Sequence, residues 1–192
     1  MRNGFRAGLA AALLLLPGAA AAQWQIGAEV EAAFQDDGVP SHDIGLGFAG
    51  RLGYTLPLLP FDLAPEIRVG YIDFGGPTES PSAMPGTVDM LRVTGGARLS
   101  FGTFLRPVLF AHVGWGDLAI DIDEREQAGD VEGSMRGWSD THRTATTWDV
   151  GAGLGVRLLS MIDLGVHLAY NRLGGDADVS WVSAGVLAGL RL

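Results

Sequence analysis

The chain has 192 residues and a formal net charge of −9, and 47% of its residues are hydrophobic. This length suits a single domain, and an acidic chain without basic clusters argues against a nucleic-acid partner. The sequence contains no Cys, which excludes disulfides and a lipid-anchored cysteine. Its 29 Gly are too many for a helical protein, and most of them lie in stretches where apolar residues alternate with small or charged ones.

The first residues have the pattern of a removable export signal. Two Arg precede a short apolar core at residues 7–16, and small residues lead up to Ala22, as signal-peptidase cleavage requires. An apolar core of about ten residues is too short to cross a bilayer as a helix. We therefore predict a cleaved signal peptide at residues 1–22 and an exported domain at residues 23–192.

The exported part contains eight stretches in which every second residue is apolar, the period of a β-strand with one apolar face. Two of them, Trp148–Leu158 and Ile162–Tyr170, are joined by a short break and predict a hairpin. The other six stretches are residues 24–34, 44–56, 63–74, 89–101, 105–116 and 179–192. Long polar connections alternate with short ones, and an even number of strands can close without an edge. The sequence therefore predicts an all-β fold, an eight-stranded antiparallel up-and-down transmembrane β-barrel.

The longest expected connection, Asp117–Ala145, is strongly acidic at residues 117–132. It lacks the spacing of an EF-hand, so we expect a solvated charged loop, and calcium binding there stays open. Ile120 and Ile122 continue the alternation, which indicates that the two flanking strands can project above the membrane.

Outward aromatic residues gather at both ends of the predicted strands, as the two membrane interfaces select. We expect Phe48 nearer the middle. The periplasmic rim is predicted to hold Trp24, Tyr54 and Phe101, and the extracellular rim Phe34, Tyr71, Trp115, Trp148 and Tyr170.

The stretches Arg106–Gly116 and Trp148–Arg157 resemble strand patterns of the OmpA/OmpX-like small outer-membrane β-barrel families. This resemblance implies an outer-membrane location, contact with outer-membrane lipid and lipopolysaccharide, and delivery by periplasmic chaperones and the barrel-assembly machinery. The last strand departs from the family's C-terminal assembly signal, because it ends in Leu192 where Phe is usual. Such patterns support a fold strongly and a function weakly, and they do not identify a surface ligand.

Charged residues fall on the opposite face of the same strands, which predicts ions inside the barrel. An eight-stranded barrel is just wide enough for its own side chains, and isolated buried charges would be costly. We therefore expect a paired network that plugs the lumen, including an Arg157–Asp163 pair across the hairpin. The excess of Arg leaves a narrow anion-preferring pore as an alternative. The predicted lumen ions are Glu29, Glu31, Arg51, Glu66, Arg68, Arg92, Arg98, Arg106, Asp149, Arg157, Asp163 and Arg191.

Two further alternatives remain at this point. A soluble lipocalin-like binding barrel would turn the apolar face inward around a ligand. An outer-membrane lipid-modifying enzyme would need a catalytic constellation, and the His-x-Ser-Asn pattern of a deacylase is absent after both His112 and His142. His112 and His167 point inward, where we expect them to be hydrogen-bonded lumen residues. The sequence predicts a structural or surface-interaction barrel without enzyme activity, cofactor or metal.

Overall fold

The computed structural model describes residues 23–37, 44–58, 60–75, 86–122, 141–158, 161–175 and 178–192. The predicted signal peptide lies outside these residues and stays a prediction. The described residues form eight strands, β1 Gln23–Asp37, β2 Gly45–Leu58, β3 Phe61–Asp73, β4 Gly86–Phe101, β5 Leu105–Ile122, β6 Thr141–Leu158, β7 Ile162–Leu173 and β8 Val179–Arg191.

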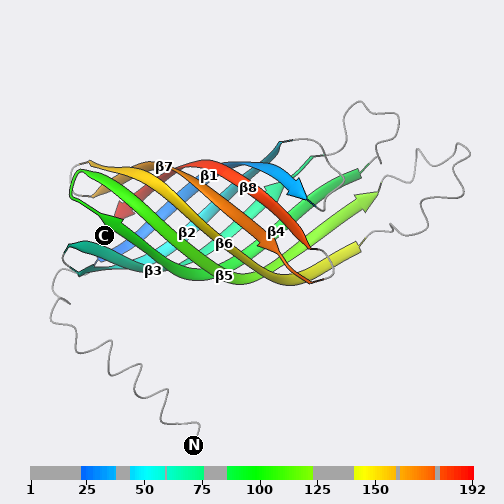
Figure 1. The fold of residues 1–192 in the computed structure, drawn as a ribbon, viewed down its shortest axis with the longest axis horizontal. Helices are drawn as coiled ribbons and strands as arrows, with labels where there is room; N and C mark the ends of the chain where they lie inside the picture. The colour runs from blue at the N-terminus through cyan, green and yellow to red at the C-terminus, as the bar shows by residue number, and fades with distance from the viewer. Residues whose placement is uncertain are drawn as a thin grey trace, which may run out of the picture.

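Each strand pairs antiparallel with the next, and β8 pairs with β1, so the sheet closes into a barrel (Figure 1). This arrangement confirms the predicted all-β, eight-stranded up-and-down fold. Within the described ranges, no helix is long and apolar enough to cross a membrane.

The two ends of the barrel differ, as the alternation of connections predicts. Short connections follow β2, β4 and β6 at one end, called the turn end here, where β1 begins and β8 ends. There the Leu192 amide donates to the Trp24 carbonyl at 2.9 Å. The turn between β4 and β5 uses Gly102 at φ +83°, a left-handed conformation that glycine adopts without a Cβ penalty. The opposite end, called the loop end, carries the longer connections.

Strand boundaries differ from the prediction by a few residues at several connections, and two of them bear on the lumen. The expected loop Asp117–Ala145 is too long, because β5 continues to Ile122 and β6 begins at Thr141. The alternation through Ile120 continues as a strand because β4 still pairs with this part of β5. The rest of the acidic stretch lies outside the described residues. Asp62, expected in a link, belongs to β3.

Alternate side chains point into the lumen and outward, because successive residues of a strand face opposite sides of the sheet. On β6, Val150 is 49% exposed and Leu154 is 44% exposed, both on the outer surface. The charged residues of the same strands face inward. A lipocalin-like barrel requires the reverse arrangement, so the structure does not fit that alternative.

Candidate functional site in the barrel lumen

The lumen brings the predicted ions together and is layered along the barrel axis. Ten of the twelve predicted ions are buried, whereas the side chains of Arg157 and Asp163 are 21% and 17% exposed near the turn end. Charged side chains fill the turn end and the middle of the lumen. The loop end is apolar inside.

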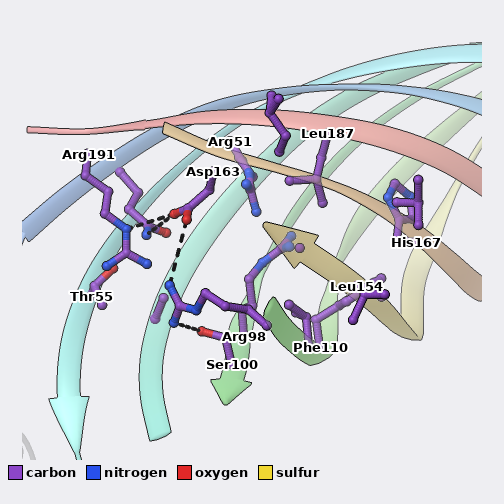
Figure 2. A pocket seen from close by; sticks show the side chains of 18 residues that line it. Arg51, Thr55, Arg98, Ser100, Phe110, Leu154, Asp163, His167, Leu187 and Arg191 are labelled. Atoms are coloured by element: carbon purple, nitrogen blue, oxygen red, sulfur yellow. Dashed lines mark hydrogen bonds and ion pairs between the residues drawn. The ribbon is translucent and has the colours of Figure 1, made fainter. Parts of the chain in front are cut away.

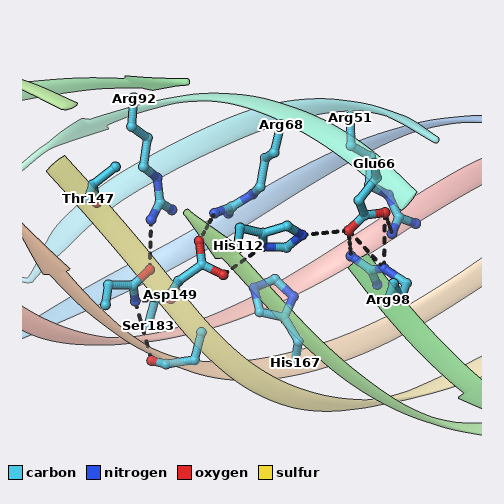
Figure 3. Close-up of polar contacts among 12 residues, drawn as sticks. Arg51, Glu66, Arg68, Arg92, Arg98, His112, Thr147, Asp149, His167 and Ser183 are labelled. Atoms are coloured by element: carbon cyan, nitrogen blue, oxygen red, sulfur yellow. Dashed lines mark hydrogen bonds and ion pairs between the residues drawn. The ribbon is translucent and has the colours of Figure 1, made fainter. Parts of the chain in front are cut away.

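The middle layer is a network of four Arg with four carboxylates. Figure 3 shows the four Arg with two of the carboxylates, Glu66 and Asp149. Arg68 is central to it: its Nε donates to Glu29 Oε2 at 2.8 Å, and its Nη2 lies 3.1 Å from Glu31 Oε1. Arg51 and Arg68 are directly opposite on β2 and β3, a like-charge pair that would be unfavourable alone. Glu29 compensates both, since Arg51 Nε lies 3.8 Å from its Oε1. The full set is Glu29, Glu31, Arg51, Glu66, Arg68, Arg92, Arg98 and Asp149.

His112 on β5 joins two carboxylates of this layer. Its Nδ1 lies 2.7 Å from Asp149 Oδ1 on the neighbouring β6, and its Nε2 lies 2.9 Å from Glu66 Oε1 on β3. Two carboxylate acceptors are both satisfied only when both ring nitrogens carry a proton. The geometry therefore indicates an imidazolium that adds one positive charge to the lumen.

His167 on β7 also points inward, as predicted. Its ring packs edge-on against Phe110 with centroids 5.8 Å apart, and its Nε2 lies 4.0 Å from Glu31 Oε2. Among the described residues, no group of three or more His, Cys, Asp or Glu is arranged to hold a metal ion.

The turn-end layer combines three Arg with two Asp. The predicted pair is confirmed, since Arg157 Nε donates to Asp163 Oδ1 at 3.2 Å across the hairpin. Asp163 Oδ2 also accepts from Arg191 Nε at 2.8 Å. The second carboxylate, Asp62, accepts from Arg106 Nη2 at 2.5 Å and from Arg157 Nη2 at 3.3 Å. The sequence prediction omitted Asp62, although its parity with Glu66 on β3 places it on the inward face.

The loop-end layer is an apolar cap that the sequence prediction did not distinguish. Trp181 lies at its base and is fully buried, with its ring edge-on to Phe74 at 6.0 Å between centroids. Arg92 connects the cap to the ions: it pairs with Glu31, donates to Asn171 Oδ1 at 2.7 Å and lies 5.6 Å over the Trp181 ring. The buried members of the cap are Ala33, Ile72, Phe74, Val88, Met90, Leu118, Ile120, Leu173, Val179 and Trp181.

Inward glycines make room for the larger lumen residues. Gly96 is paired with His112, and a Cβ added there would lie 2.7 Å from the His112 Cα. At Gly185 the same Cβ would lie 2.6 Å from the His167 Cε1. Outward Gly95, in contrast, has nothing within 4 Å of an added Cβ. The close packing therefore explains part of the glycine content of the inward faces.

On the outer surface, aromatic side chains pair near both ends of the strands. At the turn end Trp24 contacts Tyr54, with ring centroids 5.2 Å apart. At the loop end Trp148 contacts Tyr170 at 5.6 Å. The placement of Phe48 nearer the middle is wrong, because the stagger of the strands sets Phe48 directly opposite Tyr71, with centroids 5.6 Å apart.

The spacing of the two rims matches a bilayer. Trp24 and Phe34 are ten residues apart on β1, which corresponds to about 33 Å along the strand. A strand tilted by about 40° rises about 25 Å over that length, the height of the apolar band of outer-membrane barrels.

Beyond the loop-end rim, the polarity of the two faces reverses. On β5, outward Asp117 accepts from Thr144 Oγ1 at 3.0 Å, whereas inward Leu118 is only 2% exposed. On β3 and β4, outward Asp73 and Asp89 are directly opposite each other, and their inward neighbours belong to the cap. A polar outside and an apolar inside is the pattern of a barrel in water. The reversal therefore marks where the strands leave the lipid.

Transmembrane β-barrels have an apolar outer belt that contacts lipid and a polar or charged interior. These features define this chain as a β-barrel of the outer membrane. The sequence agrees, because the profile described as outer membrane protein beta-barrel domain matches residues 8–188. The chain belongs to this family. A search of curated proteins finds no match.

Solved structures with the same fold share little sequence with the chain. The Neisserial surface protein A is 20% identical, with a TM-score of 0.50 over 89% of this chain and 96% of that one. Ail of Yersinia pestis, solved with the heparin analogue sucrose octasulfate, is 18% identical, with a TM-score of 0.54 over 89% and 97%. A major outer membrane protein of Thermus thermophilus is 10% identical, with a TM-score of 0.57 over 90% and 100%. At these identities the likeness concerns the fold alone.

Proposed function

We propose that the protein is a non-conducting, non-enzymatic barrel of the outer membrane that serves a structural or surface-interaction role. The single observation that carries this proposal is the filling of its lumen by three successive layers. The turn-end ions, the middle network and the apolar cap each draw side chains from several strands. An eight-stranded barrel has little width beyond what its side chains occupy.

The pairing of the ions supports a plug over the anion-preferring pore. A conducting lumen needs mobile water along its length, whereas Arg92 is 1% exposed and Trp181 is fully buried. Arg92, on β4, reaches across the lumen to Glu31 on β1 and Asn171 on β7, the two strands that flank β8. Moving it aside would take one of two guanidinium partners from the buried carboxylate of Glu31, which is costly.

The outer surface supports contact with lipid and lipopolysaccharide in the outer membrane. What Ail binds is not carried over, since its heparin analogue is a polyanion. Among the described residues, the outer face beyond the loop-end rim carries Asp73, Asp89 and Asp117, and Arg172 there is paired with Asp178, so such a surface does not favour a polyanion. Any surface ligand would have to be recognised by a different chemistry.

Planar-bilayer recordings test the plug directly. Purified wild-type protein should show no steady conductance. A double variant, Arg92→Ala with Trp181→Ala, removes the contact between the middle network and the cap and should produce openings. Trp24→Ala, which shortens a side chain on the outer surface, should stay silent like the wild type. Stable wild-type openings that favour chloride over potassium would overturn the plug in favour of the pore.

A further inference from the structure

A cavity of about 40 Å³ lies inside the barrel between the turn-end ions and the middle network (Figure 2). Four Arg line it: Arg51 and Arg98 belong to the middle network, and Arg106 and Arg191 to the turn-end layer. The only carboxylate among the described lining residues is Asp163. The cavity is therefore surrounded by more positive than negative charge.

The cavity exists because β6 and β7 present glycine on their inward faces at this level. Gly153 and Gly155 line it, and Gly155 is directly opposite Gly165 on β7. A Cβ added at Gly155 would find its nearest heavy atom 3.5 Å away, an ordinary contact, so the position is open toward the cavity. Val108 and Phe110 supply apolar walls on the neighbouring strand β5, where Val108 pairs with Gly153.

Two guanidinium N–H groups at this cavity lack acceptors. Among the guanidinium groups that line it, Arg51 Nη1 and Arg106 Nε have no hydrogen-bond partner in the described part of the chain; Arg92 Nε, which does not line the cavity, is a third such nitrogen. The Arg51 and Arg106 side chains are only 6% and 4% exposed. The closest carboxylate oxygen to Arg51 Nη1 is Glu66 Oε2 at 3.7 Å, beyond hydrogen-bond distance. Buried cationic donors without an acceptor are uncommon, because no hydrogen bond then offsets the free energy of their desolvation.

The charge of the whole lumen points the same way. Its described ions are seven Arg and six carboxylates, namely Asp62, the three Glu at 29, 31 and 66, Asp149 and Asp163. With the His112 imidazolium the cations number eight, and eight minus six leaves an excess of two positive charges. Each layer has one of them: the middle holds five cations and four anions, and the turn end holds three and two. The cavity lies between the two layers.

We propose that this cavity is a binding site for one small monovalent anion of the halide class, with chloride as the physiological ion. Arg51 Nη1 and Arg106 Nε are the donors, and the anion compensates one of the two excess positive charges from a position between the two layers. The volume corresponds to roughly three water-sized spheres, enough for a halide but not for an organic anion such as gluconate. The apolar walls favour weakly hydrated halides. The site uses the filled lumen of the proposed function but does not depend on what the loops bind.

Unfolding of the full chain in detergent tests the site, with the midpoint compared in sodium chloride, sodium bromide and sodium gluconate at equal ionic strength. The wild-type midpoint should rise with chloride and bromide in a saturable manner and stay unchanged in gluconate. Arg51→Met removes a donor, and Gly155→Val fills the cavity without altering charge. Both should lose the halide dependence, whereas the matched controls Arg172→Met and Gly95→Val, outside the lumen, should keep it.

A second measurement keeps the proposal falsifiable if a lumen variant does not fold. Crystals of the wild type grown in bromide should show an anomalous peak in the cavity between Arg51 and Arg106. An empty or water-filled cavity in bromide, or equal wild-type midpoints in chloride and gluconate, would overturn the site. Conductance recordings are independent of both results, so a pore and a missing anion site are distinguishable.

Discussion

The Arg157–Asp163 pair allows a quantitative test of the lumen register. Asp163 contacts three guanidinium groups, at 3.2 Å from Arg157, 2.8 Å from Arg191 and 3.8 Å from Arg106. Arg157 contacts two carboxylates, Asp163 and Asp62. The two single substitutions should therefore differ. Arg157→Met leaves Asp163 paired with Arg191, whereas Asp163→Leu leaves three Arg with one remaining carboxylate.

The magnitude follows from the exposure of the pair. Breaking a buried ion pair costs about 3–5 kcal/mol, whereas exposed pairs contribute about 0.2–1 kcal/mol. The Arg157 and Asp163 side chains are 21% and 17% exposed, between these limits. We expect a loss of about 3 kcal/mol for Asp163→Leu, about 1–2 kcal/mol for Arg157→Met, and a coupling energy of about 1–2 kcal/mol.

Urea folding titrations in lipid vesicles, read by the heat-modifiable shift on gels, provide the four free energies of the double-mutant cycle. Arg172 and Asp178 supply a matched control, because they approach to 2.7 Å outside the lumen with side chains 46% and 62% exposed. The same Met and Leu replacements there should show weaker coupling. Additive losses at Arg157 and Asp163, or coupling no larger than in the exposed pair, would refute the reasoning.

Three other positions test the lipid face, the inward glycines and the cap. Leu154→Arg should lower the free energy of unfolding by about 2–4 kcal/mol, because it places a charge near mid-bilayer. Thr146→Arg, on the same face of β6 but beyond the loop-end rim, should lower it far less. Equal losses in urea titrations would contradict the orientation. Gly96→Ala should cost about 1–3 kcal/mol through overpacking, and the neighbouring outward Gly95→Ala should match the wild type in the same titrations. Trp181→Ala should cost about 3–5 kcal/mol and Trp181→Phe clearly less; a wild-type thermal midpoint for the Ala variant would show that the cap is not packed.

Strand parity made much of the lumen predictable from the sequence. Because side chains alternate with a period of two, one correct assignment on a strand fixes the face of every other residue on it. Glu29 and Glu31 on β1 were placed inward in this way. The same rule would have found Asp62, had the start of β3 been set at Phe61. The predicted stretch begins at residue 63, which leaves Asp62 in the link.

The apolar cap could not be predicted from the alternation of apolar and charged residues. The rule for that alternation assigns the apolar face to lipid and the charged face to the lumen, which holds only inside the bilayer. Beyond Trp115 the outside is polar, so inward Leu118 and Ile120 carry the opposite chemistry at unchanged parity. The sequence predicts a loop from Asp117, although the alternation through Ile120 and Ile122 also indicates the projecting strand that β5 forms. Which carboxylate meets which Arg also depends on contacts across the lumen, such as His112 with Glu66, that no single hairpin determines.

The charged middle of the lumen has a further physical consequence for assembly. Buried ion networks are often no more stabilising than apolar packing of equal volume, so stability alone does not explain them. The register of the strands does explain them. A slip of one residue would turn Glu66 and Arg68 of β3 toward lipid and bring Ile67 into the lumen. Each Arg moved to the lipid face near mid-bilayer costs about 2–4 kcal/mol. An apolar lumen would impose no such penalty, because both faces of every strand would then suit lipid. By this argument the ionic network favours one pairing of the eight strands, because its carboxylates and guanidinium groups meet only in that pairing.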